Sequence, residues 1–142
     1  MQRPRQKLVP MSKELSLQET GQLLEAAQKI VLCTHVSPDG DTLGSSLGLA
    51  LSLKKLGKEV IVYCDDLINK SFGFIPGIDL VQRPEQGSKI ACDLLVVVDA
   101  SSFDRIGIVA DVVEYKQLLN IDHHISNTRF ADYLYLDAKA AA

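Results

Sequence analysis

The stretch Leu94-Leu-Val-Val-Val98 is the strongest strand signal in the chain, and it ends abruptly at Asp99. Its apolar residues are continuous rather than alternating, which is typical of a strand covered on both faces of a parallel sheet. Similar runs predict strands at residues 30–34, 58–64 and 118–121. An alternating run at 131–136 indicates an edge strand.

Helical patterns lie between these strands. Ser16-Leu-Gln-Glu19 has the form of a capping box and predicts a helix over 16–28, and a second predicted helix covers 42–56 and stops before Gly57. A weak helix is expected at 108–116, whereas the glycines and prolines of 65–88 indicate a loop with one short helix. This alternation predicts an α/β fold, a doubly wound and mostly parallel sheet with helices on both faces.

The composition is that of one ordinary globular domain. The chain has 142 residues, of which 46% are hydrophobic and 23% charged, so we expect a flexible lead-in over 1–15 and one lobe over 16–142. No apolar run approaches the roughly 20 residues needed to span a bilayer, which argues against a membrane protein. A net charge of −3 and the absence of Trp argue against a basic or aromatic surface for nucleic acid.

The cysteines and the N-terminal segment indicate the compartment. Cys33, Cys64 and Cys92 are odd in number and form no Cys-x-x-Cys pair, which favours buried, reduced thiols over a disulfide framework. The basic N-terminal segment lacks the apolar core of a signal peptide. We therefore expect a cytoplasmic protein.

Polar residues follow three of the predicted strands directly. The segments are His35-Val-Ser-Pro-Asp39-Gly-Asp41, Asp99, and Asp122-His123-His124. Parallel strands place their carboxyl ends at one edge of the sheet, so these side chains should meet. Because clustered carboxylates repel one another, a cation among them is expected. Oxygen and nitrogen ligands without thiolate suit Mn²⁺, Mg²⁺ or Zn²⁺.

The helix that follows Asp41 begins with the small residues Gly44, Ser45 and Ser46. Such a helix start lets an anion approach unpaired backbone N–H groups, which makes Ser45 a candidate phosphate contact. Structural readings stay open for single residues: Asp41 is also a good N-cap, and Asp99 suits a turn. Likewise, a lone histidine such as His35 after a strand is more often structural or surface-exposed than a ligand, and His123-His124 alone is consistent with a surface pair.

Three motifs, in this order, resemble those of the DHH phosphoesterase superfamily. They are His35-Val-Ser-Pro-Asp39-Gly-Asp41-Thr-Leu-Gly-Ser45, Val-Val-Val-Asp99 and Ile-Asp122-His123-His124-Ile-Ser-Asn127. Within this RecJ-like superfamily the likeness is strongest to the bacterial branch of oligoribonucleases and phosphoadenosine-phosphate phosphatases, the nanoRNase group. It extends over nearly all the chain from about residue 20 onward.

The resemblance implies a pair of metal ions. Two Mn²⁺ ions are expected in the complete enzyme, with Mg²⁺ or Co²⁺ as alternatives, and the carboxylate of Asp99 matches the bridging position. One ion would be held by His35 and Asp39, the other by Asp41 and His123. In such pairs the ions activate a shared water that attacks phosphorus.

The resemblance also implies roles on the substrate side. His124 matches a histidine beside the attacked phosphate and its nucleophilic water, and Asp122 matches a partner that orients the neighbouring histidines. Asn127 and Arg129 are implied as phosphate contacts. Asp104-Arg105 is expected to be structural, as a local ion pair.

One departure concerns the C-terminal side. Members of the superfamily carry a further motif that gives the second metal another Asp, and then a separate lobe that grips the substrate. The chain stops at Ala142, so the resemblance implies a catalytic lobe truncated before both, with an incomplete second metal site. Asp137 is either a stand-in ligand or an ordinary Asp at a strand exit, and its place in the pattern favours the latter.

The function implied is hydrolysis of short oligoribonucleotides, phosphoadenosine phosphate or both, as a Mn²⁺-dependent phosphodiesterase or phosphomonoesterase. Alternatives are a cyclic-dinucleotide phosphodiesterase, a pyrophosphatase, or a non-catalytic nucleotide-binding module, and the truncated lobe by itself could be inactive. The expected partners are a short RNA or nucleotide phosphate and a second copy in a homodimer, without a membrane. A dinucleotide-binding oxidoreductase is disfavoured because no Gly-x-Gly-x-x-Gly follows the first strand.

Overall fold

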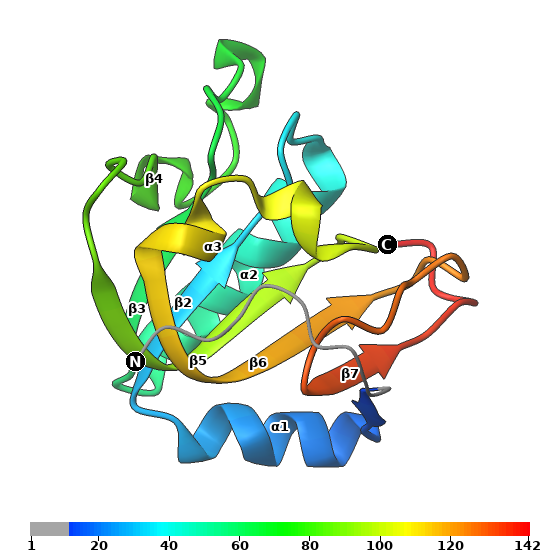
Figure 1. Ribbon diagram of the computed structural model, residues 1–142. Coiled ribbons are helices and arrows are strands. Elements are labelled where there is room, and N and C mark those ends of the chain that lie inside the picture. The colour runs from blue at the N-terminus through cyan, green and yellow to red at the C-terminus, as the bar shows by residue number, and fades with distance from the viewer. Residues whose placement is uncertain (1–11) are drawn as a thin grey trace.

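The run at residues 94–98 lies in β5 (Ile90–Val98), the central strand of a seven-stranded sheet in the computed structural model, which describes residues 12–142. The strand order is β1-β7-β6-β5-β2-β3-β4, and every pairing is parallel (Figure 1). The other strands are β1 (Lys13–Glu14), β2 (Lys29–Cys33), β3 (Glu59–Tyr63), β4 (Val81–Gln82), β6 (Val113–Asp122) and β7 (Tyr133–Leu136). The prediction of a doubly wound α/β sheet is confirmed.

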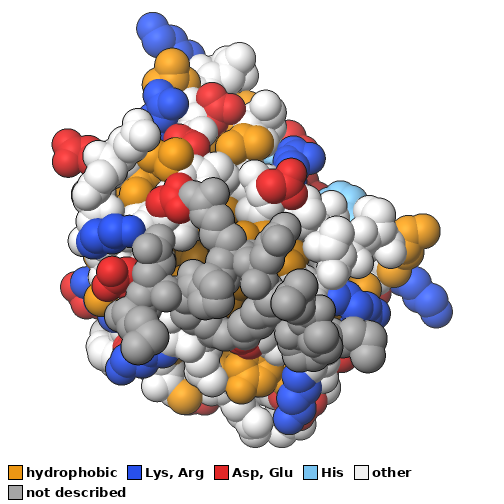
Figure 2. All heavy atoms as spheres, viewed as in Figure 1, with side chains coloured by type: hydrophobic (Ala, Val, Ile, Leu, Met, Phe, Trp, Pro, Cys, Tyr) orange, Lys and Arg blue, Asp and Glu red, His pale blue; other side chains and the backbone are white. Residues whose placement is uncertain are grey.

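Acidic and basic side chains are interspersed over the face of the molecule viewed in Figure 2. This distribution agrees with the small net charge of −3. No helix within residues 12–142 combines the length and the apolar character needed to cross a bilayer.

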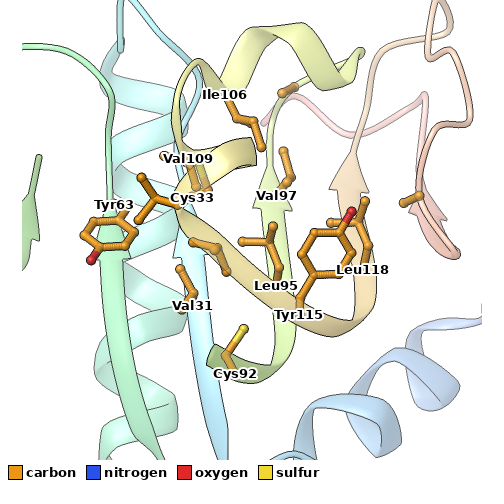
Figure 3. Close-up of a cluster of buried hydrophobic side chains, with 14 residues drawn as sticks. Val31, Cys33, Tyr63, Cys92, Leu95, Val97, Ile106, Val109, Tyr115 and Leu118 are labelled. Carbon is orange, nitrogen blue, oxygen red and sulfur yellow. The ribbon is translucent and has the colours of Figure 1, made fainter. Parts of the chain in front are cut away.

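Helices cover both faces of the sheet. Alternate residues of β2 point to opposite sides, so that Ile30 and Leu32 belong to one core cluster and Val31 and Cys33 to the other. The first cluster is covered by α1 (Leu17–Ala26) and α2 (Gly40–Lys55). The second is covered by the 3-10 helix η3 (Phe103–Ile106) and the one-turn helix α3 (Val109–Val112), as Figures 1 and 3 show.

Capping residues mark the N-termini of α1 and α2 and the C-terminus of α2. Ser16 forms both bonds of the predicted capping box with Glu19. The N-cap of α2 is Asp39, whose Oδ1 accepts from the backbone N–H of Thr42, so the alternative in which Asp41 is the cap is wrong. Gly57, with φ of +81°, follows the C-cap of α2 as expected.

The helix expected at 108–116 is mostly wrong. Only Val109–Val112 is helical, and β6 begins at Val113. The reason is pairing: Val113 and Tyr115 lie in register with Ile90 and Cys92, which lengthens both β5 and β6 beyond the predicted runs. Tertiary pairing therefore overrides the weak local helical pattern.

The loop over 65–88 and the N-terminal lead-in also differ from expectation. The loop contains two 3-10 turns, η1 (Lys70–Phe72) and η2 (Ile78–Leu80), and the strand β4. Of the predicted lead-in, residues 1–11 lie outside the described residues, whereas β1 pairs with β7. That pairing makes β7 the second strand from the edge rather than the edge itself.

The sheet has a switch point between β2 and β5. From β2 the chain continues outward through β3 and β4, and from β5 it continues through β6 and β7 in the other direction. Ligands of doubly wound sheets bind beyond the carboxyl ends of the strands at such a point.

Candidate metal centre

The carboxylate of Asp99 lies at the switch point between two imidazoles from neighbouring strand ends. Its Oδ2 is 3.5 Å from Nε2 of His35, which follows β2, and its Oδ1 is 2.9 Å from Nε2 of His123, which follows β6. Asp99 itself follows β5 and is only 6% exposed. One carboxylate thus presents a different oxygen to each histidine, as a ligand that bridges two cations would.

Asp99 is held in an unfavourable backbone conformation. Its φ is +64°, in the left-handed region that residues other than glycine seldom adopt, and its N–H donates to the carbonyl of Ile121 at 2.9 Å. Burial, together with the nearby carboxylate of Asp41, raises the pKa of Asp99. The burial and the neighbouring carboxylate disfavour an ionised Asp99, and a bound cation would offset that cost.

The tautomer of His35 follows from its neighbours. Nδ1 is 2.7 Å from the carbonyl oxygen of Val36, and because a carbonyl can only accept, Nδ1 must carry the proton. Nε2 then directs a lone pair toward Asp99 and toward Oδ1 of Asp39, 3.7 Å away. An imidazole fixed by a backbone carbonyl, with its other nitrogen among carboxylates, is a typical metal ligand.

His123 has the same arrangement. Nδ1 is 3.2 Å from the carbonyl of Ala140, and Nε2 faces Oδ1 of Asp99 and Oδ2 of Asp41, the latter at 3.2 Å. Burial disfavours the imidazolium of His123, but the carbonyl and the two carboxylates outweigh it and raise the pKa of His123.

These donor groups fit a divalent cation pair. Two sets of ligand atoms each lie within 4.8 Å of one another, and both contain Asp99: His35, Asp39 and Asp99, and Asp99, Asp122, His123 and His124. Asp41 adjoins the second set through its contact with His123. All these donors are oxygen or nitrogen, which suits Mn²⁺, Mg²⁺ or Zn²⁺ better than a soft metal.

His124 lies at the solvent-facing rim of the centre. Its side chain is 44% exposed, and its Nδ1 is 2.6 Å from Oδ1 of the buried Asp122. Asp122 therefore orients His124, and leaves Nε2 as the ring nitrogen available to a ligand.

A cavity of about 240 Å³ adjoins the second set of ligands. Its polar lining comprises Asp41, Ser45, Asp99, Asp122, His123 and Asp137. The hydroxyl of Ser45 donates to Oδ1 of Asp41 at 3.2 Å, which holds that carboxylate toward the cavity. Asp137 follows β7, and its Oδ1 accepts from the backbone N–H of Lys139, as a carboxylate at a strand exit often does.

Two residues predicted as phosphate contacts have other partners. The amide of Asn127 is fully used: Nδ2 donates to Asn120 and to Asp122, and Oδ1 accepts from the backbone N–H of Arg129. The guanidinium of Arg129 is paired with Glu14 on β1. Both side chains therefore have partners within the fold, and their role as phosphate contacts stays a prediction.

A model of the DHH family, N-terminal domain, matches residues 29–142. The chain belongs to the DHH family. The match covers all three motifs, from β2 to the last residue.

Several curated relatives share this DHH domain. The chain is 34% identical over 113 residues to the bifunctional oligoribonuclease and PAP phosphatase NrnA of Thermus thermophilus, covering 80% of this chain and 33% of the relative. It is 37% identical over 114 residues to the protein of the same name in Mycoplasma genitalium, covering 79% and 35%. A probable manganese-dependent inorganic pyrophosphatase of Enterococcus faecalis is 27% identical over 78% of the chain and 36% of the relative.

A solved structure has the same DHH fold. The exopolyphosphatase-related protein from Bacteroides fragilis superposes with a TM-score of 0.77 at 26% identity, covering 88% of this chain and 39% of that one. The chain thus spans about a third of the length of the curated relatives it matches.

No role at the centre was predicted from the sequence for Arg105, and Asn120 was not singled out. Arg105, expected to form a structural ion pair with Asp104, places a guanidinium nitrogen 3.4 Å from both Nδ1 of His35 and the carbonyl of Val36. Asn120 is fully buried beside the turn at Asp99. The available signal for Asn120 was its position as a polar residue inside the apolar run 118–121.

Proposed function

We propose that this chain is the catalytic lobe of a divalent-metal-dependent phosphoesterase that hydrolyses short oligoribonucleotides, phosphoadenosine phosphate or both. The observation that carries the proposal is the position of Asp99, whose two oxygens face Nε2 of His35 and Nε2 of His123. Similarity to the NrnA proteins of two genera supports the substrate class.

His35, Asp39 and Asp99 would hold one ion, and Asp41, Asp99 and His123 the other. When bound, two such ions neutralise phosphate oxygens and make a hydroxide nucleophile available near neutral pH. Mn²⁺ is the expected metal, supported by the manganese-dependent relative, with Mg²⁺ or Co²⁺ as alternatives. The clustered carboxylates then have a reason to lie together, because the cations offset their repulsion.

The substrate side of the centre is formed by His124. Asp122 holds the proton on Nδ1 of His124, so Nε2 faces the solvent-accessible side where a phosphate group would enter. Water adds to phosphorus, the ester oxygen leaves as a ribose hydroxyl, and the products are a phosphate monoester or inorganic phosphate and an alcohol. With its proton on Nδ1, His124 presents the lone pair of Nε2, which would accept a hydrogen bond from the water that attacks phosphorus.

The complete protein, on this proposal, is cytoplasmic and includes a C-terminal lobe that grips the substrate. The support for the further lobe is the share of the relatives' length that this chain spans, about a third. That further part would also supply the remaining Asp of the second metal site. A homodimer belongs to the same proposal.

The test is hydrolysis by the purified full-length protein with Mn²⁺. Ribonucleotides of two to five residues should release mononucleotides, phosphoadenosine phosphate should release phosphate, and chelation of the metal should abolish both. Absence of turnover on both substrates, with metal bound, would overturn the proposal.

Inorganic pyrophosphate is a second candidate substrate, favoured by the similarity to the Enterococcus faecalis protein. The same assay therefore includes pyrophosphate and a cyclic dinucleotide. Turnover of either one, with none of RNA or phosphoadenosine phosphate, would replace the proposed substrate class. Binding without turnover would indicate a nucleotide-binding module.

A further inference from the structure

A buried amide holds the turn that carries Asp99. Asn120 lies on β6, is 0% exposed, and its Nδ2 donates to the carbonyl of Val97 at 3.0 Å and to that of Ala100 at 3.1 Å. These two carbonyls flank Asp99, the residue with the left-handed backbone. One carboxamide thus closes the turn from both sides of the strained residue.

The same amide begins a chain of hydrogen bonds that ends at His124. Oδ1 of Asn120 accepts from Nδ2 of Asn127 at 2.7 Å, and that Nδ2 also donates to Oδ2 of Asp122 at 2.7 Å. The other oxygen of Asp122 lies 2.6 Å from Nδ1 of His124. This series of hydrogen bonds therefore links the turn at Asp99 to the imidazole of His124 at the rim.

The donor and acceptor of each hydrogen bond in this series follow from the chemistry of the groups. Backbone carbonyls only accept, so Asn120 must present its nitrogen to Val97 and Ala100 and its oxygen to Asn127. Asn127 must then present its nitrogen, and Oδ2 of Asp122 accepts from it. The remaining donor to Asp122 is the Nδ1–H of His124. The network thus selects one tautomer and one ring orientation for that histidine.

We infer that Asn120 and Asn127 are positioning residues that hold the carboxylate of Asp99 and the imidazole of His124 in a fixed relation. The inference rests on the proposed function for its consequence in catalysis, though not for its geometry. A fully satisfied polar network is rigid, and loss of one member leaves buried partners unpaired. Partners that orient metal ligands in this way typically change metal affinity or activity 10- to 100-fold when removed, which sets the scale at about that range.

The wild-type protein provides the first test. In the full-length protein labelled with ¹⁵N-histidine and free of metal, His124 should show a protonated Nδ1 with slow solvent exchange. A His124 ring protonated at Nε2 alone would overturn the inference without any variant. Because this measurement needs no substrate, its outcome is independent of the proposed function.

Asn127→Ala provides the second test, at a half-buried position that disturbs packing less than Asn120. We expect the protected Nδ1–H signal of His124 to be lost and kcat on a short ribonucleotide to fall about 10- to 100-fold with KM little changed. Asn120→Ser should do the same and also weaken Mn²⁺ binding, because it releases the turn at Asp99. Gln28→Ala is the control. Gln28 directly precedes β2, and the substitution removes a carboxamide that donates to the carbonyl of Gly57.

The outcomes of these tests distinguish the positioning inference from the proposed function. An Asn127→Ala protein that is less stable but keeps both the His124 signal and kcat has lost only a structural contact, which would overturn the inference. If the wild type hydrolyses none of the substrates while the signal is lost in Asn127→Ala and kept in Gln28→Ala, the proposed function fails and the positioning network stands.

Discussion

Oδ1 of Asp99 lies 2.9 Å from Nε2 of His123, a residue 24 positions further along the chain. The contact follows from the register of the two central strands, because Val98 of β5 pairs with Ile121 of β6 and so brings their carboxyl ends level. A slip of one residue would turn the side chains of one strand to the opposite face. The pairing of β5 with β6 therefore determines the geometry of the candidate metal centre.

Replacing Asp99 tests the bridge. Asp99→Asn keeps the shape of the side chain but removes its charge, so we expect Mn²⁺ binding to be lost at both positions rather than at one. Titration calorimetry on the full-length protein measures the number of ions bound. An Asp99→Asn protein that still binds two ions would refute the bridging role.

Each of the two histidines should contribute to the binding of one metal ion. Since His35 and His123 face different oxygens of Asp99, His35→Gln and His123→Gln should each weaken one ion and leave the other bound. The affinity for the remaining ion should change by no more than about tenfold, because that ion keeps its direct ligands. Manganese electron paramagnetic resonance distinguishes one ion from a coupled pair. Loss of both ions in either variant would show that the positions are not separable.

In the metal-free protein, stability should fall as pH rises. The pKa values of Asp99 and His123 are both raised, so each group stabilises the fold below its ordinary pKa and loses that contribution as pH rises through its folded value. The expected window starts above the ordinary value of 3.8 for Asp99 and above 6.5 for His123. Thermal unfolding in chelator from pH 5 to about pH 8 measures the slope, with saturating Mn²⁺ as the comparison. A metal-free melting temperature that rises over this range would contradict the assignment.

The sequence was sufficient to predict that these Asp and His side chains lie together, because residues directly after apolar strands meet at one edge of a parallel sheet. It could not predict the partners of Asn127 and Arg129, since Asn120 and Glu14 come close only after the strands are ordered. The helix expected at 108–116 was wrong for a similar reason, because pairing with β5 extends the chain from Val113. Local pattern identifies which residues are polar at a strand end, whereas register decides what they contact.

The three cysteines should be unreactive in the folded protein. Cys33, Cys64 and Cys92 are free and buried, and burial raises the pKa of each thiol, that of Cys92 to about 11. At pH 8 a thiol with that pKa is about one part in a thousand thiolate, so little nucleophile is present even where reagent can reach. A disulfide reagent should therefore modify no cysteine in the native state and all three in denaturant. Rapid modification of the native protein would reveal a local opening of the sheet.

Gly107 should be the least replaceable glycine among those described. It ends η3 with φ of +59° and ψ of −138°, a conformation that residues with a Cβ avoid. An added Cβ would also lie 2.9 Å from Cβ and Cγ of Asp65, whose carboxylate must stay in place to accept from the N–H of Ile108. Strain and clash act together, so Gly107→Ala should lower the free energy of unfolding by about 2–4 kcal/mol.

Gly21 provides the matched control for that substitution. It lies inside α1, where an added Cβ meets nothing within 4 Å, so Gly21→Ala should raise the free energy of unfolding by about 0.5–1 kcal/mol through helix propensity alone. Urea unfolding of both variants under one condition gives effects of opposite sign. If Gly107→Ala stays within about 0.5 kcal/mol of wild type, the loop that carries Asp65 must move aside, and the hydrogen bond to Ile108 does not fix this turn.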